Sequence, residues 1–413
     1  MIERVIRAAK AVGAKNFVIV TGYRADDIKH HLGNGSKLGV SISYAHNQNW
    51  EKAENGVSVL AAEHLLKGKT FLLLMADHLV SEGIVARVAA ASLSEAACAL
   101  GVDFRPKNVD LDDATKVEVQ NGKITGIGKG LSRYDGVDTG VFKATSALFE
   151  ALRTAVKQGD STLSGGIRVL TQKEGVAAVD VTNSLWCDLD TPADWRRAQR
   201  LLLSSLKKPT DGPVSRLFNR PLSTRITSLL VRLPLTPNGL TLISFLLSLV
   251  SAAFFACWGR LGSLLGGITA QVASVLDGCD GEVARLKYME TEYGGWMDAV
   301  LDRYGDAAIF AAIAANIQTI APHPTALPLA FAAAVGSILN AYTAIKHDSL
   351  FRSRMRFRFG RDVRMFLVMV AGVIAFFVPS SLLLFLAFIA ILTNTVNIVR
   401  LIRHAYHSRT SPQ

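Results

Sequence analysis

The sequence has few cysteines, four in 413 residues, and none of them forms a CxxC pair. They also lie in apolar surroundings, and both features argue against zinc ligation and against a disulfide scaffold. Charged residues are also scarce, at 19%, whereas 50% of the residues are hydrophobic. This balance excludes a wholly disordered or fibrous chain. The length suits two or three domains, and we expect small buried thiols in a reducing compartment at Cys98, Cys187, Cys257 and Cys279.

Acidic residues are outnumbered, with 34 Asp and Glu against 45 Lys and Arg, which gives a formal net charge of +11. Such an excess suits nucleic acid, a membrane surface or a phosphate-rich substrate. No zinc-finger or RNA-recognition signature accompanies the charge, so we expect no nucleic-acid partner. The first residues, MIERVIRAAKAVGAKNF, lack a continuous apolar core. They predict an amphipathic helix that starts a soluble domain, not a secretory signal.

Residues 1–205 alternate strand-like and helical patterns. Apolar runs at 16–23, 69–77, 96–104 and 176–181 read as strands, and the segments 2–13, 55–68 and 145–159 read as helices. This alternation predicts an α/β domain with a mainly parallel sheet. Residues 206–235 contain Lys, Pro, Gly and Ser followed by RLFNRPLSTRITSLLVRL. They predict a linker and an amphipathic helix at a membrane interface.

Residues 236–413 carry apolar stretches that are too long for ordinary soluble helices. We count six of them and predict an all-α membrane domain of six transmembrane helices. A span needs about 20 residues. The second and third stretches reach that length only by including the polar segments DGCDGEVARL and GGWMDAVLDRYGD.

Basic residues are distributed unevenly among the connections between these spans. The connections 1–2, 3–4 and 5–6 contain one, Arg260, whereas the connection 4–5 contains Lys346, Arg352, Arg354, Arg356, Arg358, Arg361 and Arg364. Lys and Arg are retained on the cytoplasmic side. We therefore predict an integral protein of the cell membrane with both termini and its active site in the cytoplasm. A homodimer is compatible with the sequence, which does not fix the oligomeric state.

The strongest chemical signal is a set of four aspartates in spans 2 and 3. Asp277 and Asp280 are three residues apart, and Asp298 and Asp302 are four apart, so each pair shares one helix face. Four buried like charges near a membrane are very costly unless cations neutralise them. Carboxylates suit hard cations such as Mg²⁺ or Mn²⁺, which in turn suit phosphate oxygens.

Small residues accompany the four aspartates. Gly281 and Ala284 keep the adjoining surface low enough for a nucleotide to approach the backbone, and Gly294 permits a tight start to span 3. The alternative interpretation is a set of salt bridges with Arg285, Lys287 and Arg303. Three cations would satisfy four clustered carboxylates less well than a metal, so we favour the metal site.

The pattern D-x2-DG-x2-AR-x8-G-x3-D-x3-D, from Asp277 to Asp302, resembles the signature of the CDP-alcohol phosphotransferase family at all eight fixed positions. TPNGLT at 236–241 resembles the usual beginning of that family's first span. The resemblance implies divalent metals, two in number, on Asp277, Asp280 and Asp298. It also implies that Asp302 helps to bind them or is the catalytic general base on the acceptor hydroxyl. The implied CDP pocket comprises Asn238, Asp277, Gly281, Ala284, Arg285 and Gly294.

Two acidic segments in the first half also suggest metal chemistry. FLLLMADHLV places Asp77 at the end of a strand, and SLWCDLDTPADW supplies Asp188 and Asp190 before a helix. Such acids could hold a metal on a triphosphate, or they are strand-end turns and helix caps. The order NxxWxxxENGVS, MADH, VDTGVF and WCDLDTPAD resembles the sugar-phosphate and inositol-phosphate nucleotidyltransferases. The resemblance implies a Rossmann-like sheet, with Asp77 and Asp188 as the metal-binding acids.

That family opens with a strand and a glycine-rich loop that holds the nucleotide phosphates, and no GxGxR-like segment precedes Met1. Either the chain as given starts about one βα-unit late, which is roughly 30 residues, or this domain serves as a scaffold. Loss of a phosphate-binding backbone should disable nucleotidyl transfer. We therefore expect residues 1–205 alone to make no CDP-alcohol from CTP and inositol 1-phosphate.

The fusion of the two halves resembles the bifunctional inositol-1-phosphate cytidylyltransferase and di-myo-inositol phosphate phosphate synthase subgroup. The resemblance implies CDP-inositol as the donor and inositol 1-phosphate as the acceptor. The loop before span 5 brings Arg361 and Arg364 to the side of Asp302, so we expect them to anchor the acceptor phosphate. The alternative is that these arginines only set orientation and bind anionic lipid headgroups. One alternative is a phospholipid synthase that uses a CDP-diacylglycerol-type donor. Another, from a different class, is a membrane transporter or scaffold, in which the GxxAR frame would have no purpose.

Overall fold

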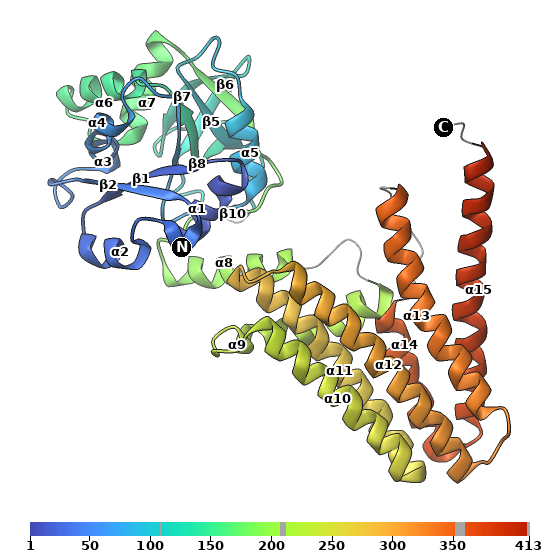
Figure 1. Ribbon diagram of the computed structural model, residues 1–413. Helices are drawn as coiled ribbons and strands as arrows, with labels where there is room; N and C mark the ends of the chain where they lie inside the picture. Colours follow the sequence, from blue (N-terminus) through green and yellow to red (C-terminus); the bar gives the residue numbers. More distant parts are fainter. Residues whose placement is uncertain (108, 207–211, 352–359, 411–413) are drawn as a thin grey trace. The chain divides into compact units, whose positions relative to one another are not determined.

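The computed structural model describes residues 1–107, 109–206, 212–351 and 360–410 (Figure 1). The chain divides into two compact units, Met1–Leu201 and Leu202–Gln413. Residues 207–211 of the predicted linker and the arginines at 352–358 of the basic connection lie outside the described residues. The domain boundaries that we placed after residues 205 and 235 stay predictions.

The first unit is an α/β domain. Its described strands are β1 (Asn16–Thr21), β2 (Ser41–His46), β3 (Phe71–Leu74), β4 (Leu79–Val80), β5 (Cys98–Asp103), β6 (Lys116–Gln120), β7 (Lys123–Gly128), β8 (Gly136–Ala144), β9 (Val176–Asp180) and β10 (Trp186–Cys187). Its described helices are α1 (Ile2–Ala11), α2 (Ala25–Leu32), η1 (Ser36–Leu38), α3 (Asn55–Ala61), α4 (Glu63–Leu66), α5 (Glu82–Ala90), α6 (Ala147–Lys157), α7 (Leu163–Lys173) and α8 (Pro192–Ser205). The predicted strands and helices are therefore confirmed in place.

The main sheet of this unit has the strand order β3-β8-β5-β9-β7-β6. Within it only the pair β5–β9 is parallel in the described part of the chain, whereas β8 runs antiparallel to β3, β5 and β6. The mainly parallel sheet that we predicted is wrong. The alternation of strands and helices overlooked the β6–β7 hairpin, which turns at Asn121 and Gly122 with positive φ angles of 51° and 74°.

Strand β8 divides the core of the first unit into two layers. Val137 and Val141 pack with Ile84 on one face of the sheet, whereas Phe142 packs with Leu148 on the other. Successive side chains of a strand point to opposite faces, so this alternation follows from the pleat. The strand beside it, β5, is buried along its whole length.

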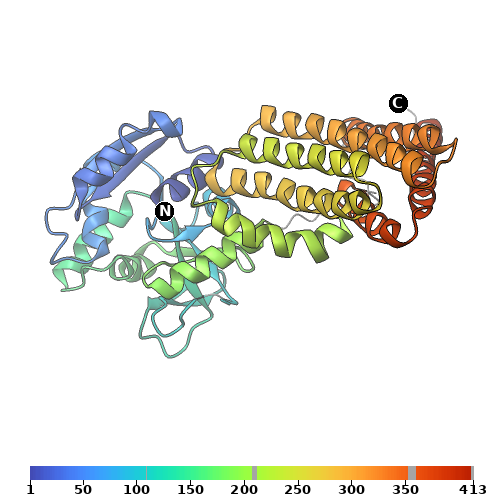
Figure 2. The same ribbon diagram turned by 90° about the horizontal axis from the view of Figure 1, so that it is seen from below.

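The second unit is helical, and its long helices α10, α11 and α12 run side by side in both views (Figures 1 and 2). Its described helices are η2 (Ser215–Asn219), α9 (Arg220–Leu230), α10 (Pro237–Cys257), α11 (Gly259–Lys287), α12 (Glu292–Ile320), α13 (Ala326–Phe351), α14 (Arg361–Phe377) and α15 (Ser381–Thr410). Two of the helices around the acidic motif, α10 and α12, begin at a threonine cap. The Oγ1 of Thr236 accepts the Gly239 N–H at 3.2 Å, and the Oγ1 of Thr291 accepts the Gly294 N–H at 2.9 Å.

Three helices of the described residues are long and apolar enough to cross a membrane, with the stretches Pro237–Cys257, Ala326–Lys346 and Ser381–Arg403. The six transmembrane helices that we predicted are thus not confirmed. Helices α11 and α12 carry the acidic motif, which lowers their hydropathy, and α14 has only 17 residues.

Helices α11 and α14 approach each other through two glycines. A Cβ on Gly267 would lie 3.1 Å from the Met369 Cα, and one on Gly372 would lie 3.1 Å from the Gly267 Cα. Gly267 is ten residues before Asp277, and Gly372 is eleven after Arg361. At 1.5 Å per residue the two antiparallel helices therefore bring Asp277 and Arg361 to the same level, about 15 Å from the glycine contact.

Polar side chains of α15 bond to carbonyl groups of α13. The Asn394 Nδ2 donates to the Ala332 oxygen at 3.0 Å, the Asn397 Nδ2 donates to the Gly336 oxygen at 3.0 Å, and the Arg400 Nη1 donates to the Asn340 oxygen at 2.6 Å. These bonds explain how TNTVN is accommodated in an apolar helix, because the side-chain amides of Asn394 and Asn397 both have carbonyl partners.

Helix α9 is fastened to α11 by one buried acid. The Glu282 carboxylate is 0% exposed. It accepts the Arg220 Nη1 at 2.6 Å and the hydroxyls of Ser223 and Thr227 at 2.7 Å each. All three donors belong to α9, so Glu282 fixes this short helix against the motif helix.

We expect Glu282→Ala to lower the melting temperature of the purified full chain by about 6 °C or more. Removing one member of a buried ion pair leaves the other charge uncompensated, at a cost of about 3–5 kcal/mol, and each kcal/mol shifts the midpoint by about 2–4 °C for a unit of this size. The exposed Glu292 gives the matched control. Equal melting of Glu282→Ala and Glu292→Ala in a thermal scan would contradict this role.

Candidate functional site

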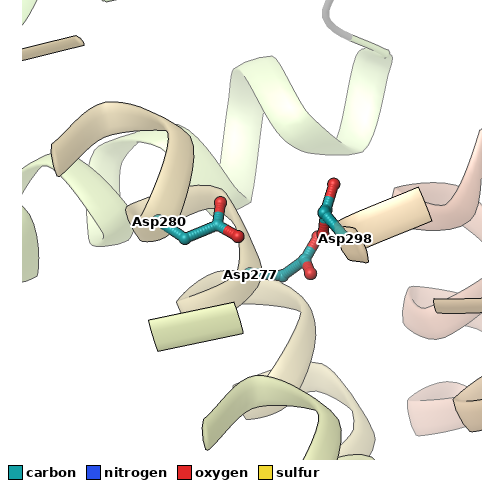
Figure 3. Close-up of side chains that lie close together, drawn as sticks. All are labelled: Asp277, Asp280 and Asp298. Atoms are coloured by element: carbon teal, nitrogen blue, oxygen red, sulfur yellow. The ribbon is translucent and has the colours of Figure 1, made fainter. Parts of the chain in front are cut away.

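Three aspartates from two helices meet in the second unit. Asp277 and Asp280 lie on α11 and Asp298 lies on α12, and one oxygen of each lies within 4.8 Å of the others (Figure 3). Asp280 is 9% exposed and accepts the Thr241 hydroxyl of α10. The carboxylates therefore share a small space between α10, α11 and α12.

The cluster fits a divalent cation. Within the described residues the Asp277 Oδ1 and the Asp298 Oδ1 are buried and have no hydrogen-bond donor. An unsatisfied buried carboxylate oxygen is costly, and a hard cation is the ligand that carboxylate oxygens suit. Asp277, Asp280 and Asp298 are the described residues that could hold such an ion.

Arg361 is the cation that the structure brings to these carboxylates. It begins α14, and its Nη1 lies 3.1 Å from the Asp277 Oδ1 and 2.8 Å from the Asp302 Oδ1. Neither contact has hydrogen-bond geometry, because this Nη1 is buried without an acceptor among the described residues. The guanidinium thus neutralises charge and keeps a donor directed into the site.

Asp302 lies apart from the three-aspartate cluster. Its Oδ1 faces Arg361, and its Oδ2 lies 3.4 Å from the Arg303 Nη1. We expected four carboxylates to converge, but the structure groups three and connects the fourth to them through Arg361. Of the other basic residues in our salt-bridge interpretation, Lys287 donates instead to the carbonyl oxygens of Leu233 and Leu235.

The residues predicted to line a CDP pocket lie beside the cluster. A Cβ on Gly294 would be 3.0 Å from the Asn238 Oδ1, so α10 and α12 meet where these two residues face each other. A Cβ on Gly281 would be 3.3 Å from the Arg285 Nη1, so the arginine lies over the glycine. Gly294 lies in the first turn of α12, where the lack of a side chain allows Asn238 to approach closely.

Asp306 is a residue of this site that sequence reasoning missed. It is 2% exposed, and it accepts the Arg361 Nε at 3.0 Å and the Arg364 Nη2 at 2.7 Å. Both arginines lie on α14 itself and not in the connection before it. A signal was present, because Asp298, Asp302 and Asp306 repeat at four-residue intervals along one helix face.

The first unit has its own acidic cavity of about 200 Å³. Asp77 and Asp188, which we predicted as metal-binding acids, both line it, together with Asp190. Asp138 of β8 also lines it and was not predicted. Gly140 adopts a φ of +73°, and a Cβ there would be 2.7 Å from the His78 ring, so only glycine fits this wall.

The charges in this cavity influence one another. The hydrogen bond from the His78 Nδ1 at 2.9 Å lowers the pKa of Asp77. Burial lowers the pKa of His78, but the hydrogen bond to Asp77 and the charges of Asp77, Asp138 and Asp188 together raise it. Burial raises the pKa of Asp188 and raises that of Asp138 to about 6. Acids that titrate so differently within one cavity are typical of a functional site.

The four cysteines take no part in either site. Cys98, Cys187 and Cys279 are buried, as expected for small apolar side chains. Cys257, at the end of α10, is exposed, so the expectation of burial is wrong at that position.

Comparison with known proteins supports the division of the chain into two units. Residues 234–399 match the family "CDP-alcohol phosphatidyltransferase", and residues 1–112 match "Nucleotidyl transferase". The "Bifunctional IPC transferase and DIPP synthase" of Aquifex aeolicus is 33% identical over 407 residues, which cover 95% of this chain and 88% of the relative. The protein of the same name from Rubrobacter xylanophilus is 34% identical, covering 91% and 84%. The "Archaetidylinositol phosphate synthase" of Pyrococcus horikoshii is 38% identical over 90 residues, which cover 22% of this chain and 46% of the relative.

The fold and the motif together define a CDP-alcohol phosphotransferase, a transferase enzyme, joined to a nucleotidyltransferase-like domain. Similarity to its relatives extends across both halves. The chain belongs to the family of bifunctional IPC transferases and DIPP synthases.

The raised pKa of Asp138 predicts how stability depends on pH. Its pKa is 3.8 in an unfolded chain and about 6 in the folded one, so this group favours folding more as the pH falls through 6. Asparagine keeps an oxygen for the Gly140 N–H, which Asp138 accepts at 2.7 Å, but carries no charge. We expect Asp138→Asn to raise the melting temperature by about 2–4 °C at pH 8 and by about half as much at pH 5, because the difference disappears fully only below the unfolded pKa of 3.8. Asp112→Asn, at an exposed position, should change the melting temperature equally at pH 8 and at pH 5. A pH-independent effect of Asp138→Asn would contradict the prediction.

Proposed function

We propose that this enzyme transfers phosphoinositol from CDP-inositol to inositol 1-phosphate, with release of CMP, at the site formed by α10, α11, α12 and α14. The observation that carries the proposal is the convergence of Asp277, Asp280 and Asp298, two of which have buried oxygens without hydrogen-bond donors. The Arg361 Nη1 lies beside them and forms ion pairs without hydrogen-bond geometry. The names of the relatives support the choice of substrates, since they refer to IPC, DIPP and archaetidylinositol phosphate.

We propose that Asp277, Asp280 and Asp298 hold the divalent metals, Mg²⁺ or Mn²⁺. Ions held there would supply Lewis-acid polarisation of the donor pyrophosphate and neutralisation of charge on the departing phosphate. Asn238 and Gly294 face each other beside the cluster, and Arg285 lies over Gly281. These contacts support a CDP pocket of Asn238, Asp277, Gly281, Ala284, Arg285 and Gly294.

In the proposed reaction a hydroxyl oxygen of the acceptor attacks the β-phosphorus of the donor. The bond from that phosphorus to the CMP oxygen breaks, CMP leaves with the electron pair, and Asp302 takes the proton of the attacking hydroxyl. Asp302 is suited to this role because it lies outside the three-aspartate cluster and Arg361 holds its carboxylate. Arg361 and Arg364 are the proposed anchors of the acceptor phosphate, since guanidinium groups bind phosphate through paired donors.

We infer that α11, α12 and α14 also cross the bilayer, which gives six spans with the active site on the cytoplasmic side of the cell membrane. Each of the three packs against helices of the same bundle, and α14 contacts α11 along its length. The 17 residues of α14 rise about 26 Å, close to the hydrocarbon thickness of about 30 Å. The single basic residue in the connections opposite the site, Arg260, supports this orientation.

Asp298→Asn tests the proposed metal site. A neutral amide binds hard cations poorly, so we expect the variant to fold and insert but to release less than about 1% of the wild-type CMP, as judged from typical losses of catalytic groups. CMP release from CDP-inositol with Mg²⁺ is the measurement, with Glu290→Gln, an exposed acid between α11 and α12, as the control. Near-wild-type activity of Asp298→Asn would rule out the assignment.

Arg361→Ala tests the anchor of the acceptor phosphate. Loss of a charged hydrogen bond to phosphate should raise the KM for inositol 1-phosphate by about tenfold, whereas Arg260→Ala, an exposed arginine outside the site, should leave it unchanged. An arginine that only sets orientation would alter expression and leave KM alone.

A comparison of two acceptors, inositol 1-phosphate and free inositol, tests the substrate class. Product from free inositol alone would argue against the phosphate anchor, and no product from either acceptor with CDP-inositol would favour a CDP-diacylglycerol-type donor.

A further inference from the structure

We propose that Asp306 is a positioning residue, which holds the Arg361 guanidinium between the metal-binding carboxylates and Asp302 and thereby sets how tightly the cluster binds a divalent cation. The inference rests on the proposed function, because it takes Asp277, Asp280 and Asp298 as the metal ligands. Asp306 itself lies outside that cluster and outside the eight-position motif.

The contacts of Arg361 divide between two edges of its planar guanidinium. Along one edge the Nε donates to the Asp306 Oδ1 at 3.0 Å, and the Nη2 donates to the Ser248 Oγ at 3.4 Å. The Nη1 points the other way, to Asp277 and Asp302. Because the guanidinium is rigid, fixing the first edge fixes the direction of the Nη1.

Asp306 is itself held in place on two sides. Its Oδ1 binds Arg361 and its Oδ2 binds Arg364, and the Asp306 and Arg364 side chains are 3% and 4% exposed. A buried carboxylate shared by two guanidinium groups is stable only while all three are present, since removing one leaves a buried charge unpaired. This arrangement makes the position of Arg361 depend on Asp306.

The position of Arg361 matters for metal binding because its charge lies 3.1 Å from an oxygen of Asp277. A positive group at that distance opposes a cation on the same carboxylate. Asp306 supplies the opposing charge on the far edge of Arg361 and draws the guanidinium away from Asp277. Without Asp306 the arginine is free to pair fully with Asp277 and Asp302, and an incoming ion must displace it.

The test is Mn²⁺ binding to the purified full chain, followed by the spin resonance of free Mn²⁺, with the KM for the acceptor as a second readout. We expect Asp306→Asn to bind Mn²⁺ about tenfold more weakly, within the range of coupling between contacting residues, and to raise the acceptor KM. Asp306→Glu should recover part of both. Glu292→Gln removes the same charge from the exposed start of α12 and should change neither.

The double variant Asp306→Asn with Arg364→Gln tests whether the position of Arg361 or the local net charge controls Mn²⁺ binding. It restores the local net charge and removes the guanidinium that loses its Asp306 carboxylate in the single variant, so it covers the case in which the single variant fails to fold. We expect Mn²⁺ binding to stay weak, because the amide oxygen that replaces the carboxylate makes only a neutral hydrogen bond to the Arg361 Nε, which is about half as strong as the charge-assisted one. Wild-type affinity in the double variant, or in folded Asp306→Asn, would overturn the inference. If the wild type binds no Mn²⁺, or Asp298→Asn binds it equally well, the proposed metal site itself fails.

Discussion

Confinement of like charges between helices is the constraint on which the rest of the second unit depends. Three carboxylates lie within 4.8 Å of one another, and Asp302 and Asp306 continue the row along α12. In surroundings of low dielectric such charges repel strongly. Arg361 and Arg364 offset part of that repulsion, and bound cations would offset more. The site is therefore held together by the charges that its chemistry uses.

The scaffold that holds these charges is made of small residues and helix caps. The glycine contact between α11 and α14 lets two backbones approach, and that approach brings the first residue of α14 to the level of Asp277. The threonine caps of α10 and α12 fix where these helices begin. Glu282 of α11 accepts hydrogen bonds from α9 and holds α9 against α11. None of these groups has a chemical role in the proposed reaction, yet each determines where a reactive side chain lies.

Local patterns of the sequence predicted the helices and strands and the three-aspartate cluster, but not Asp306. The spacing of three residues correctly predicted that Asp277 and Asp280 share one face of α11, because helix geometry fixes which neighbours share a face. The expected convergence was confirmed for Asp298 and was wrong for Asp302. The pairing of Asp306 with Arg361, 55 positions away, depends on how α12 packs on α14, and no periodicity within one helix encodes it. The sheet direction was wrong for a similar reason, since strand pairing is a property of the whole domain. The Asn-Gly turn between β6 and β7 was the local signal that would have corrected it.

A hydropathy scale gives a low value to a helix that carries charged side chains, as the three helices that we propose as further spans do. Helices α10, α13 and α15 are apolar enough to be recognised as candidate spans, and in α15 buried asparagines bond to carbonyl groups of α13. Helices α11, α12 and α14 carry Asp277, Asp298 and Arg361, the groups that the site requires. Each such charge raises the free energy of a helix in lipid, but an ion pair or a bound cation between helices lowers it again. For our proposal that these three helices also cross the bilayer, the relevant stability is therefore that of the packed bundle, which a scale that evaluates one helix at a time cannot measure.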